Sequence, residues 1–252
     1  MPKDSIANEK DFLERAASTY RTEVSSQDRL MRKYSLRVLD RYLNPAASIL
    51  ELGCSDGWLT EQLAGRVRRV VSVEGSSTFA GKLQARKIPN VEVVESLFES
   101  FETEERFDLI VAGYVLEHVI DARAVIAHTS KFLAPGGVFY GLVPNASALS
   151  RQIGVAMGYL KSAYELTEND LHHGHRRVYD LKTLEQDFTD SGLAVADSGG
   201  LMLKILADFQ LDQLYDSGFL KEVHSDAFFE LGLAHPDLCG SIYCFGRRAI
   251  ES

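Results

Sequence analysis

The sequence contains few cysteines, no long apolar run and fewer bases than acids. Its three cysteines, Cys54, Cys239 and Cys244, are an odd number without C-x-x-C spacing, so we predict neither a disulfide framework nor a zinc site. We interpret them as small apolar residues in a reducing compartment. No uncharged stretch reaches the ~20 residues of a membrane span, and the first residues lack the apolar core of a signal peptide. These absences predict a soluble, cytoplasmic protein without a membrane partner.

The charge balance disfavours nucleic acid as a partner. The 252 residues include 36 acids and 27 lysines and arginines, for a formal net charge of -9. Such a charge repels a phosphate backbone unless a local basic patch offsets it. One α/β domain with an insertion can reach this length, so we predict one domain with additions.

The hydrophobic period changes after the first 45 residues. In residues 28–43, Met31, Tyr34, Val38 and Tyr42 recur at helical spacing, which predicts a helix with one apolar face. From residue 48 onward, short β-branched runs alternate with helical stretches; the runs are SILEL, RVVSVE, VEVVE, FDLIVAG and GVFYGLVP. This alternation of apolar strands and helices predicts a parallel sheet covered on both faces.

The segment GCSDG, residues 53–57, follows the first predicted strand and precedes a helix that begins near Trp58. Open α/β sheets bind ligands at this end of their strands. The dinucleotide fingerprint G-x-G-x-x-G fails here, because Ser55 and Trp58 stand where its second and third glycines would be. We therefore predict a ligand other than a dinucleotide.

The residues around this loop favour a ligand that has a ribose and a positive charge. Gly53 and Gly57 allow backbone to approach a ligand closely, and the acid Glu51 favours a cation over a pyrophosphate. Glu74 follows about 20 residues after the loop, where an acid accepts hydrogen bonds from ribose hydroxyls. S-adenosyl-L-methionine has a ribose, a sulfonium and an ammonium and lacks phosphate.

Four ordered segments resemble the motifs of class I S-adenosylmethionine-dependent methyltransferases. They are ILELGCSDG, VVSVEGS, FDLIVAGYVLEHV and LAPGGVFYGLVPN, and the resemblance covers roughly residues 47–200. It departs at Ser55, where the family often has glycine. The resemblance implies an α/β fold, with a Rossmann-like, doubly wound, seven-stranded sheet that is mostly parallel. Its seventh strand, GSIYCFGRRA at residues 240–249, would be antiparallel.

The resemblance also assigns the cofactor contacts. These residues are Glu51, Gly53, Ser55, Gly57, Glu74, Gly75, Ser96, Leu97, Phe98 and Gly113. Glu51 would lie near the ammonium and Glu74 would hold the ribose. Leu97 and Phe98 would border the adenine, and Tyr114 would lie with Gly113 beside the methyl-bearing sulfur. Taken singly, each residue could also be an ordinary strand end or helix cap.

The resemblance implies a single methyltransferase domain over residues 1–252 with helical additions. Its parts are a helical N-terminal cap (1–45), a cofactor-binding core (47–145), a lid and substrate segment (146–178) and a C-terminal part (179–252) with a helical insert (204–236). We expect the cap, the lid and the insert to lie over the carboxyl edge of the sheet and to set specificity. A homodimer through these additions stays open.

Three residues are candidates for catalysis on the acceptor side: His175, His173 and Tyr114. Methyl transfer needs an aligned nucleophile in a dry pocket, and a hydroxyl nucleophile is helped by a base such as histidine. His175 is best supported, since HGHRRVYD is similar to a segment of small-molecule members of the family. The alternatives for these histidines are a helix cap or a lid hydrogen bond. We expect no metal, because no carboxylate or cysteine spacing completes the histidine cluster, and we expect His118 to support the loop after the fourth strand.

Other residues have two interpretations each. Arg176 and Arg177 either bind an anionic substrate group or pair with Asp170 or Asp180. Four tyrosines either wall the acceptor pocket or pack in the core; they are Tyr20, Tyr34, Tyr114 and Tyr164.

The predicted function is methyl transfer from S-adenosyl-L-methionine, with S-adenosyl-L-homocysteine as product, to an oxygen or nitrogen of a small metabolite. The acceptor classes are a sugar, a quinone-like compound or a natural-product intermediate. The alternatives are a macromolecule (protein) methyltransferase and a non-catalytic S-adenosylmethionine-binding protein. The residues AGYV at 112–115 replace the Asn/Asp-Pro-Pro-Tyr tetrad of adenine-N6 and glutamine-amide enzymes, which argues against those two classes.

Overall fold

One mixed sheet organises the protein, whose computed structural model describes residues 6–19 and 25–248. The strand order is β3-β2-β1-β4-β5-β7-β6 in a seven-stranded sheet. The strands are β1 (Ser48–Leu52), β2 (Arg69–Glu74), β3 (Val91–Glu95), β4 (Phe107–Gly113), β5 (Leu133–Pro144), β6 (Leu193–Gly200) and β7 (Ser241–Arg248). Neighbouring strands from β3 to β5 pair in parallel, while β7 is antiparallel to both β5 and β6. The predicted fold class is confirmed.

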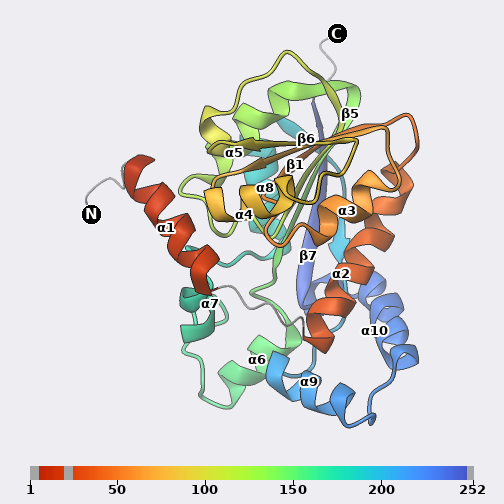
Figure 1. The fold of residues 1–252 in the computed structure, drawn as a ribbon. Coiled ribbons are helices and arrows are strands. Elements are labelled where there is room, and N and C mark those ends of the chain that lie inside the picture. Colours follow the sequence, from red (N-terminus) through yellow and green to blue (C-terminus); the bar gives the residue numbers. More distant parts are fainter. Residues whose placement is uncertain (1–5, 20–24, 249–252) are drawn as a thin grey trace.

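Helices cover both faces of this sheet (Figure 1). They are α1 (Ile6–Thr19), α2 (Ser26–Leu39), α3 (Trp58–Ala64), α4 (Ser77–Gln84), α5 (Ala122–Thr129), α6 (Leu149–Ala156), α7 (Glu168–His172), α8 (Leu181–Asp190), α9 (Asp208–Asp216) and α10 (Glu222–Ala234). Short 3₁₀ turns are at Asp40–Tyr42, Phe98–Ser100, Ser130–Phe132 and Pro236–Leu238. Within residues 6–19 and 25–248, no helix combines the length and the apolar character that crossing a bilayer demands.

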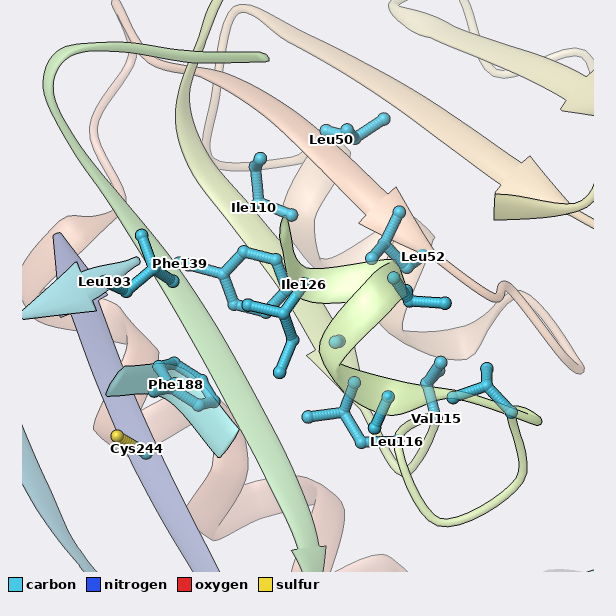
Figure 2. Close-up of a cluster of buried hydrophobic side chains, with 14 of the residues drawn as sticks. Leu50, Leu52, Ile110, Val115, Leu116, Ile126, Phe139, Phe188, Leu193 and Cys244 are labelled. Carbon is cyan, nitrogen blue, oxygen red and sulfur yellow. The ribbon is translucent and has the colours of Figure 1, made fainter. Parts of the chain in front are cut away.

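All five residues of β1 are buried, so both faces of the sheet are covered at this strand. Successive side chains of a strand point to opposite faces. Leu50 and Leu52 accordingly belong to a core under α5 and α8, whereas Ile49 belongs to a second core under α2, α3 and α10. Figure 2 shows side chains of the first core, including Leu50, Ile110 and Phe139, gathered around Ile126 of α5.

The second core depends on α2, whose ring of Tyr34 stacks on Phe229 of α10 at a centroid distance of 4.7 Å. The hydroxyl of Ser25 caps the helix by accepting a hydrogen bond from the amide of Asp28. The sequence predicted one helix over residues 28–43. The helix instead ends at Leu39, and a 3₁₀ turn precedes Pro45.

The additions lie toward the carboxyl ends of the parallel strands, where α6, α7 and α9 occupy the bottom of Figure 1 and α1 its left side. The insert expected over residues 204–236 contains two helices, α9 and α10, separated by residues 217–221. Of the cap expected over residues 1–45, residues 1–5 and 20–24 lie outside the described part. All three cysteines are free and buried, as predicted.

A close contact between β7 and α8 gives a test of the packing. A Cβ atom at Gly246 would lie 2.6 Å from Cδ1 of the buried Phe188 and 3.0 Å from Leu193. We expect Gly246→Ala to lower the free energy of unfolding by about 1–3 kcal/mol through overpacking, and to lower it less in a Phe188→Leu background. Urea denaturation measures both effects. Gly81→Ala is the control, since a Cβ there meets open space; an equal loss for both alanines would contradict this packing.

Candidate functional site

The loop between β1 and α3 has an unusual backbone. Gly53 and Gly57 have φ values of +77° and +76°, and Ser55 between them has +47°. The amide of Gly53 donates to Val73 O at 2.8 Å, and that of Gly57 donates to Cys54 O at 2.7 Å. A left-handed conformation is strained for serine and free for glycine, which explains why glycine is frequent at the position of Ser55 in the family that the sequence resembles.

Glu74 holds this loop against the end of β2. Its Oε2 accepts hydrogen bonds from the amides of Cys54 at 3.0 Å and Ser55 at 3.3 Å. Its Oε1 accepts from the amide of Ser76 at 2.9 Å. The residue is 6% exposed, so a buried carboxylate joins the two loops that follow β1 and β2.

Glu51 lies beneath the loop, fully buried in β1. Its Oε2 accepts hydrogen bonds from the hydroxyls of Thr60 at 2.6 Å and Ser72 at 2.8 Å. Its Oε1 has no partner among the described residues, and the same is true of the hydroxyl of Ser55. Burial, helped by the nearby charge of Glu74, raises the pKa of Glu51 to about 7. A cationic donor would satisfy the free oxygen.

Apolar side chains close one side of the loop. A Cβ atom at Gly53 would lie 3.8 Å from Cζ of Phe98, and one at Gly75 would lie 3.2 Å from Cδ2 of Leu97. Ser96 connects the segment of Leu97 and Phe98 to the sheet, because its amide donates a hydrogen bond to Glu74 O at 3.0 Å. The structure therefore brings these predicted cofactor residues to one place.

Two predicted glycines lie on the other side of the loop. Gly57 precedes α3, and a Cβ atom there would lie 3.0 Å from Leu83 of α4. Gly113 ends β4, where a Cβ atom would lie 3.7 Å from Leu59 of α3. These two glycines face α3 and α4 rather than the wall of Leu97 and Phe98.

Helix α1 covers the edge of the sheet beside Gly75. The sequence predicted a helical cap but did not indicate which of its residues make this contact. A Cβ atom at Gly75 would lie 2.5 Å from Cδ1 of Leu13. Glu14 accepts hydrogen bonds from the amide of Ser77 at 2.5 Å and the hydroxyl of Thr78 at 2.6 Å, at the start of α4. Nothing in the spacing of α1 marks these contacts, since they join residues about 60 positions apart.

A second cluster follows the end of β4. Nδ1 of His175 lies 3.0 Å from Oδ1 of Asp170, whose other oxygen lies 3.2 Å from Nη1 of Arg151. Although burial opposes its ionisation, hydrogen bonds from His175 and Thr167 hold the pKa of Asp170 well below its ordinary range. Asp170 therefore presents a charged acceptor that orients the ring of His175.

His118 and Glu117 complete this cluster. The rings of His118 and His175 meet edge to face at a centroid distance of 4.8 Å, and Nδ1 of His118 lies 3.3 Å from Gly174 O. Glu117 is 0% exposed, and neither carboxylate oxygen has a hydrogen-bond partner within the described chain. Burial raises the pKa of Glu117 to about 7 and lowers that of His118 to about 4. Sequence reasoning did not single out Glu117, although it directly precedes His118.

The other acceptor-side candidates differ in their surroundings. His173 is exposed, and its Nδ1 lies 2.7 Å from Asn169 O. The hydroxyl of Tyr114 lies 2.9 Å from that of Ser241. Burial raises the pKa of Tyr114 far above its ordinary value, so this phenol stays protonated at neutral pH.

The partners of the two arginines include carbonyl oxygens and one acid, and a role in binding an anionic substrate group stays a prediction. Arg177 donates to the carbonyls of Leu116 at 2.9 Å and Ile120 at 2.7 Å. Arg176 donates to His118 O at 2.6 Å and pairs with Glu9 at 2.7 Å. Both arginines tie the segment around His175 to the turn after β4, since a guanidinium offers several donors in a fixed geometry.

The other tyrosines that the sequence singled out have different surroundings. Tyr34 packs in the core, and Tyr164 is half exposed and donates to the carboxylate of Asp180. Tyr20 lies outside the described residues.

A cavity of about 390 Å³ adjoins this second cluster, and α1 and α7 border it. Its lining is formed by Glu9, Phe12, Arg15, Leu171, Gly174, His175 and Arg176. No residue of the glycine loop lines it. The cavity thus adjoins the cluster of His175 and does not reach the glycine loop.

Comparison with known proteins agrees with this geometry. Residues 22–198 match a family described as a methyltransferase domain. The chain belongs to this family. It is 28% identical over 164 residues to the mitochondrial ubiquinone biosynthesis O-methyltransferase of Homo sapiens, a match that covers 61% of this chain and 43% of that protein. The chain thus spans less than half the length of this relative.

Solved structures show the same fold at low sequence identity. The N-methyltransferase NodS of Bradyrhizobium japonicum WM9, in complex with S-adenosyl-L-homocysteine, has a TM-score of 0.59 and 18% identity, over 95% of this chain and 97% of that chain. The DhpI-SAM-HEP complex has a TM-score of 0.63 and 16% identity, over 98% and 99%. The methyltransferase fold therefore extends over nearly the whole chain.

The strain at Ser55 generates a prediction about stability. We expect Ser55→Gly to raise the free energy of unfolding by about 1 kcal/mol, because it relieves a left-handed serine and removes an unpartnered hydroxyl. Ser55→Ala removes the hydroxyl and keeps the strain, so it should gain less. Chemical denaturation of the two variants without ligand measures the difference. A lower stability of Ser55→Gly than of Ser55→Ala would show that the loop is unstrained.

Proposed function

We propose that the protein is an S-adenosyl-L-methionine-dependent methyltransferase that methylates an oxygen or nitrogen of a small metabolite. One observation carries the proposal: a loop with left-handed Gly53 and Gly57 covers a buried carboxylate oxygen of Glu51 that has no partner among the described residues. A relative and a structural neighbour that are named O- and N-methyltransferases support the acceptor atoms.

The donor set fits the cofactor. The free Oε1 of Glu51 suits an ammonium. Glu74 accepts hydrogen bonds from three backbone amides and from the thiol of Cys54, so a ribose hydroxyl at this carboxylate would replace the weak thiol donor. Leu97 and Phe98 offer apolar faces to an adenine. When bound, this cofactor supplies an electrophilic methyl group.

On the acceptor side, we propose that His175 contacts the nucleophilic group of the substrate. It lines the cavity, and Asp170 fixes its ring. His173 lies at the exposed rim, and Tyr114 stays a proposed hydrogen-bond donor near Gly113. In the reaction, the acceptor atom bonds to the methyl carbon as the sulfur–methyl bond breaks, and the acceptor releases a proton. Glu9, Phe12 and Arg15 of α1 form one wall of the cavity, and we propose that this wall limits the access of water to the reacting groups, as methyl transfer requires.

The domain division, the location in the cell and the oligomeric state are also proposals. We propose that residues 1–252 form one methyltransferase domain, with residues 146–178 as lid and substrate segment. A cytoplasmic location and a homodimer also stay predictions, and gel filtration tests the second.

Calorimetric titration with S-adenosylmethionine, S-adenosylhomocysteine and NAD tests the cofactor directly. We expect binding of the first two and none of NAD, because the loop lacks the dinucleotide fingerprint. Binding of NAD alone would overturn the proposed function.

The role of Glu74 can be measured by substitution. We expect Glu74→Gln to weaken the binding of S-adenosylhomocysteine by about 1.5–3 kcal/mol, since it loses a charge-assisted hydrogen bond. The variant should also lose the preference for the ribose compound over its 2′-deoxy analogue. Glu95→Gln is the matched control, because Glu95 pairs with Glu74 in register but is exposed. Equal effects of the two substitutions would exclude Glu74 from the ribose site.

The raised pKa of Glu51 predicts proton release on binding. Because the folded pKa of about 7 exceeds the ordinary value of 4.5, Glu51 is partly protonated in the free protein at about pH 6.5, and its contribution to stability falls as the pH rises from about 4.5 to 7. A ligand ammonium beside Glu51 lowers this pKa, so binding at about pH 6.5 should release a fraction of a proton. Calorimetry in two buffers of different ionisation enthalpy measures it. Identical heats in both buffers, or a release that persists in Glu51→Gln, would contradict this placement.

A further inference from the structure

The helix α1 presents one charged and aromatic face to the cavity of about 390 Å³. Glu9, Phe12 and Arg15 all line this cavity, and they follow one another at intervals of three positions. Residues at this spacing lie on the same face of an α-helix. The neighbouring Leu13 lies against Gly75 on the cofactor side instead. One face of α1 therefore gives the cavity side chains that can recognise a charged group.

The cavity is cationic within an acidic protein. Its lining includes the guanidinium groups of Arg15 and Arg176 but only one carboxylate, that of Glu9, so with histidine counted as neutral its net charge is +1. The whole chain has a formal net charge of -9. A cleft lined by one sign of charge concentrates ligands of the opposite sign. We propose that the cavity binds its acceptor through an oxyanion group, a carboxylate or a phosphate, and that Arg15 is the residue that contacts this group.

Arg176 supplies a fixed positive charge to the cavity. Its Nε donates to His118 O at 2.6 Å, and its Nη2 donates to Oε2 of Glu9 at 2.7 Å. Its Cζ also lies 4.6 Å from the centre of the ring of Phe12. The side chains of Arg176 and Glu9 are only 23% and 13% exposed. This pair therefore lies deep in the wall, and the carboxylate of Glu9 is compensated there.

Arg15 lies at the mouth of the cavity. Its side chain is exposed, and Leu171 of α7, which lines the same cavity, is 60% exposed. An exposed guanidinium can exchange a surface contact for a ligand at little cost, because exposed ion pairs are weak. Its planar fork matches the two oxygens of a carboxylate or phosphate. The oxyanion is therefore expected at Arg15 rather than beside the deeper Arg176.

This position of the oxyanion defines the class of acceptor, and the step rests on the proposed methyl transfer. His175 lines the same cavity, and its side chain is 13% exposed, so it lies deeper than Arg15. Between them, Phe12 and Leu171 offer apolar contacts to a ring or a short hydrocarbon. The nucleophilic oxygen or nitrogen then faces His175. The acceptor is therefore a small compound with a nucleophile at one end and an oxyanion at the other.

Ligand binding tests this class without any turnover. The probes are benzoate, phenyl phosphate and benzyl alcohol, which share one ring and differ in charge, titrated by NMR with and without S-adenosylhomocysteine. We expect at least one anion to bind about tenfold or more tightly than the neutral alcohol; the tighter anion identifies carboxylate or phosphate. Equal binding of the alcohol and the anions, or no binding of either anion at millimolar concentration, would overturn the proposal.

Two substitutions in α1 should act in opposite directions. Arg15→Gln removes the charge at the mouth and should weaken binding of the tighter anion about tenfold, with benzyl alcohol unaffected. Glu9→Gln removes the carboxylate from the lining and should strengthen anion binding, which a loss of folding cannot do. Arg66→Gln is the matched control, since this exposed arginine follows α3 and bonds to Gln62 O. Equal effects of Arg15→Gln and Arg66→Gln, or weaker binding in both α1 variants, would contradict the proposal.

Titration of the same proteins with S-adenosylhomocysteine separates the acceptor class from the proposed function. Arg15→Gln should bind S-adenosylhomocysteine as the natural protein does, because no residue of the glycine loop lines the cavity. Preference for an anion without S-adenosylhomocysteine binding would leave the oxyanion site standing and overturn the methyltransferase function. S-adenosylhomocysteine binding without that preference would overturn the acceptor class alone.

Discussion

The carboxylate of Glu74 is the constraint on which the cofactor side of the molecule depends. It accepts hydrogen bonds from the amides of Cys54 and Ser55 in one loop and from the amide of Ser76 in the next. These bonds compensate for the burial of a charge and at the same time hold the first loop in its left-handed shape. The apolar wall of Leu97 and Phe98 and the covering residue Leu13 are then placed relative to a fixed backbone. A change at Glu74 therefore alters the loop as well as any ligand contact, which is why a glutamine tests it better than an alanine.

The acceptor side is organised differently, because long side chains rather than strand ends join its parts. Arg176 connects α1, through Glu9, to the carbonyl of His118, and its guanidinium lies 4.6 Å from the centre of the ring of Phe12. Arg177 connects the same segment to the turn after β4. Arg176 therefore joins α1 to the segment around His175, and Arg177 fixes the same segment to the turn after β4.

The sequence revealed the parts of the site that depend on local patterns. Strands such as β1 and β4 are short apolar runs, and the loop at 53–57 lies between a strand and a helix, so Gly53 and Glu74 could be placed at one sheet edge before the structure was known. Contacts between distant elements were not accessible in this way. No periodicity indicates that Leu13 covers Gly75 or that Glu14 caps α4. Glu117 was overlooked because an acid beside a histidine is common, and only burial without a partner distinguishes it.

Two buried glutamates, Glu51 in β1 and Glu117 after β4, have unpartnered oxygens within the described chain. Under the proposed function their charges have opposite consequences. A carboxylate beside an ammonium stabilises a charge that persists through the reaction, so Glu51 aids binding without a penalty to the rate. A carboxylate beside a sulfonium stabilises a charge that disperses in the transition state, so it slows methyl transfer. Because Glu117 follows β4 on the side expected for the methyl group, a neutral carboxyl there avoids this penalty. The burial that raises the pKa of Glu117 to about 7 favours that neutral form.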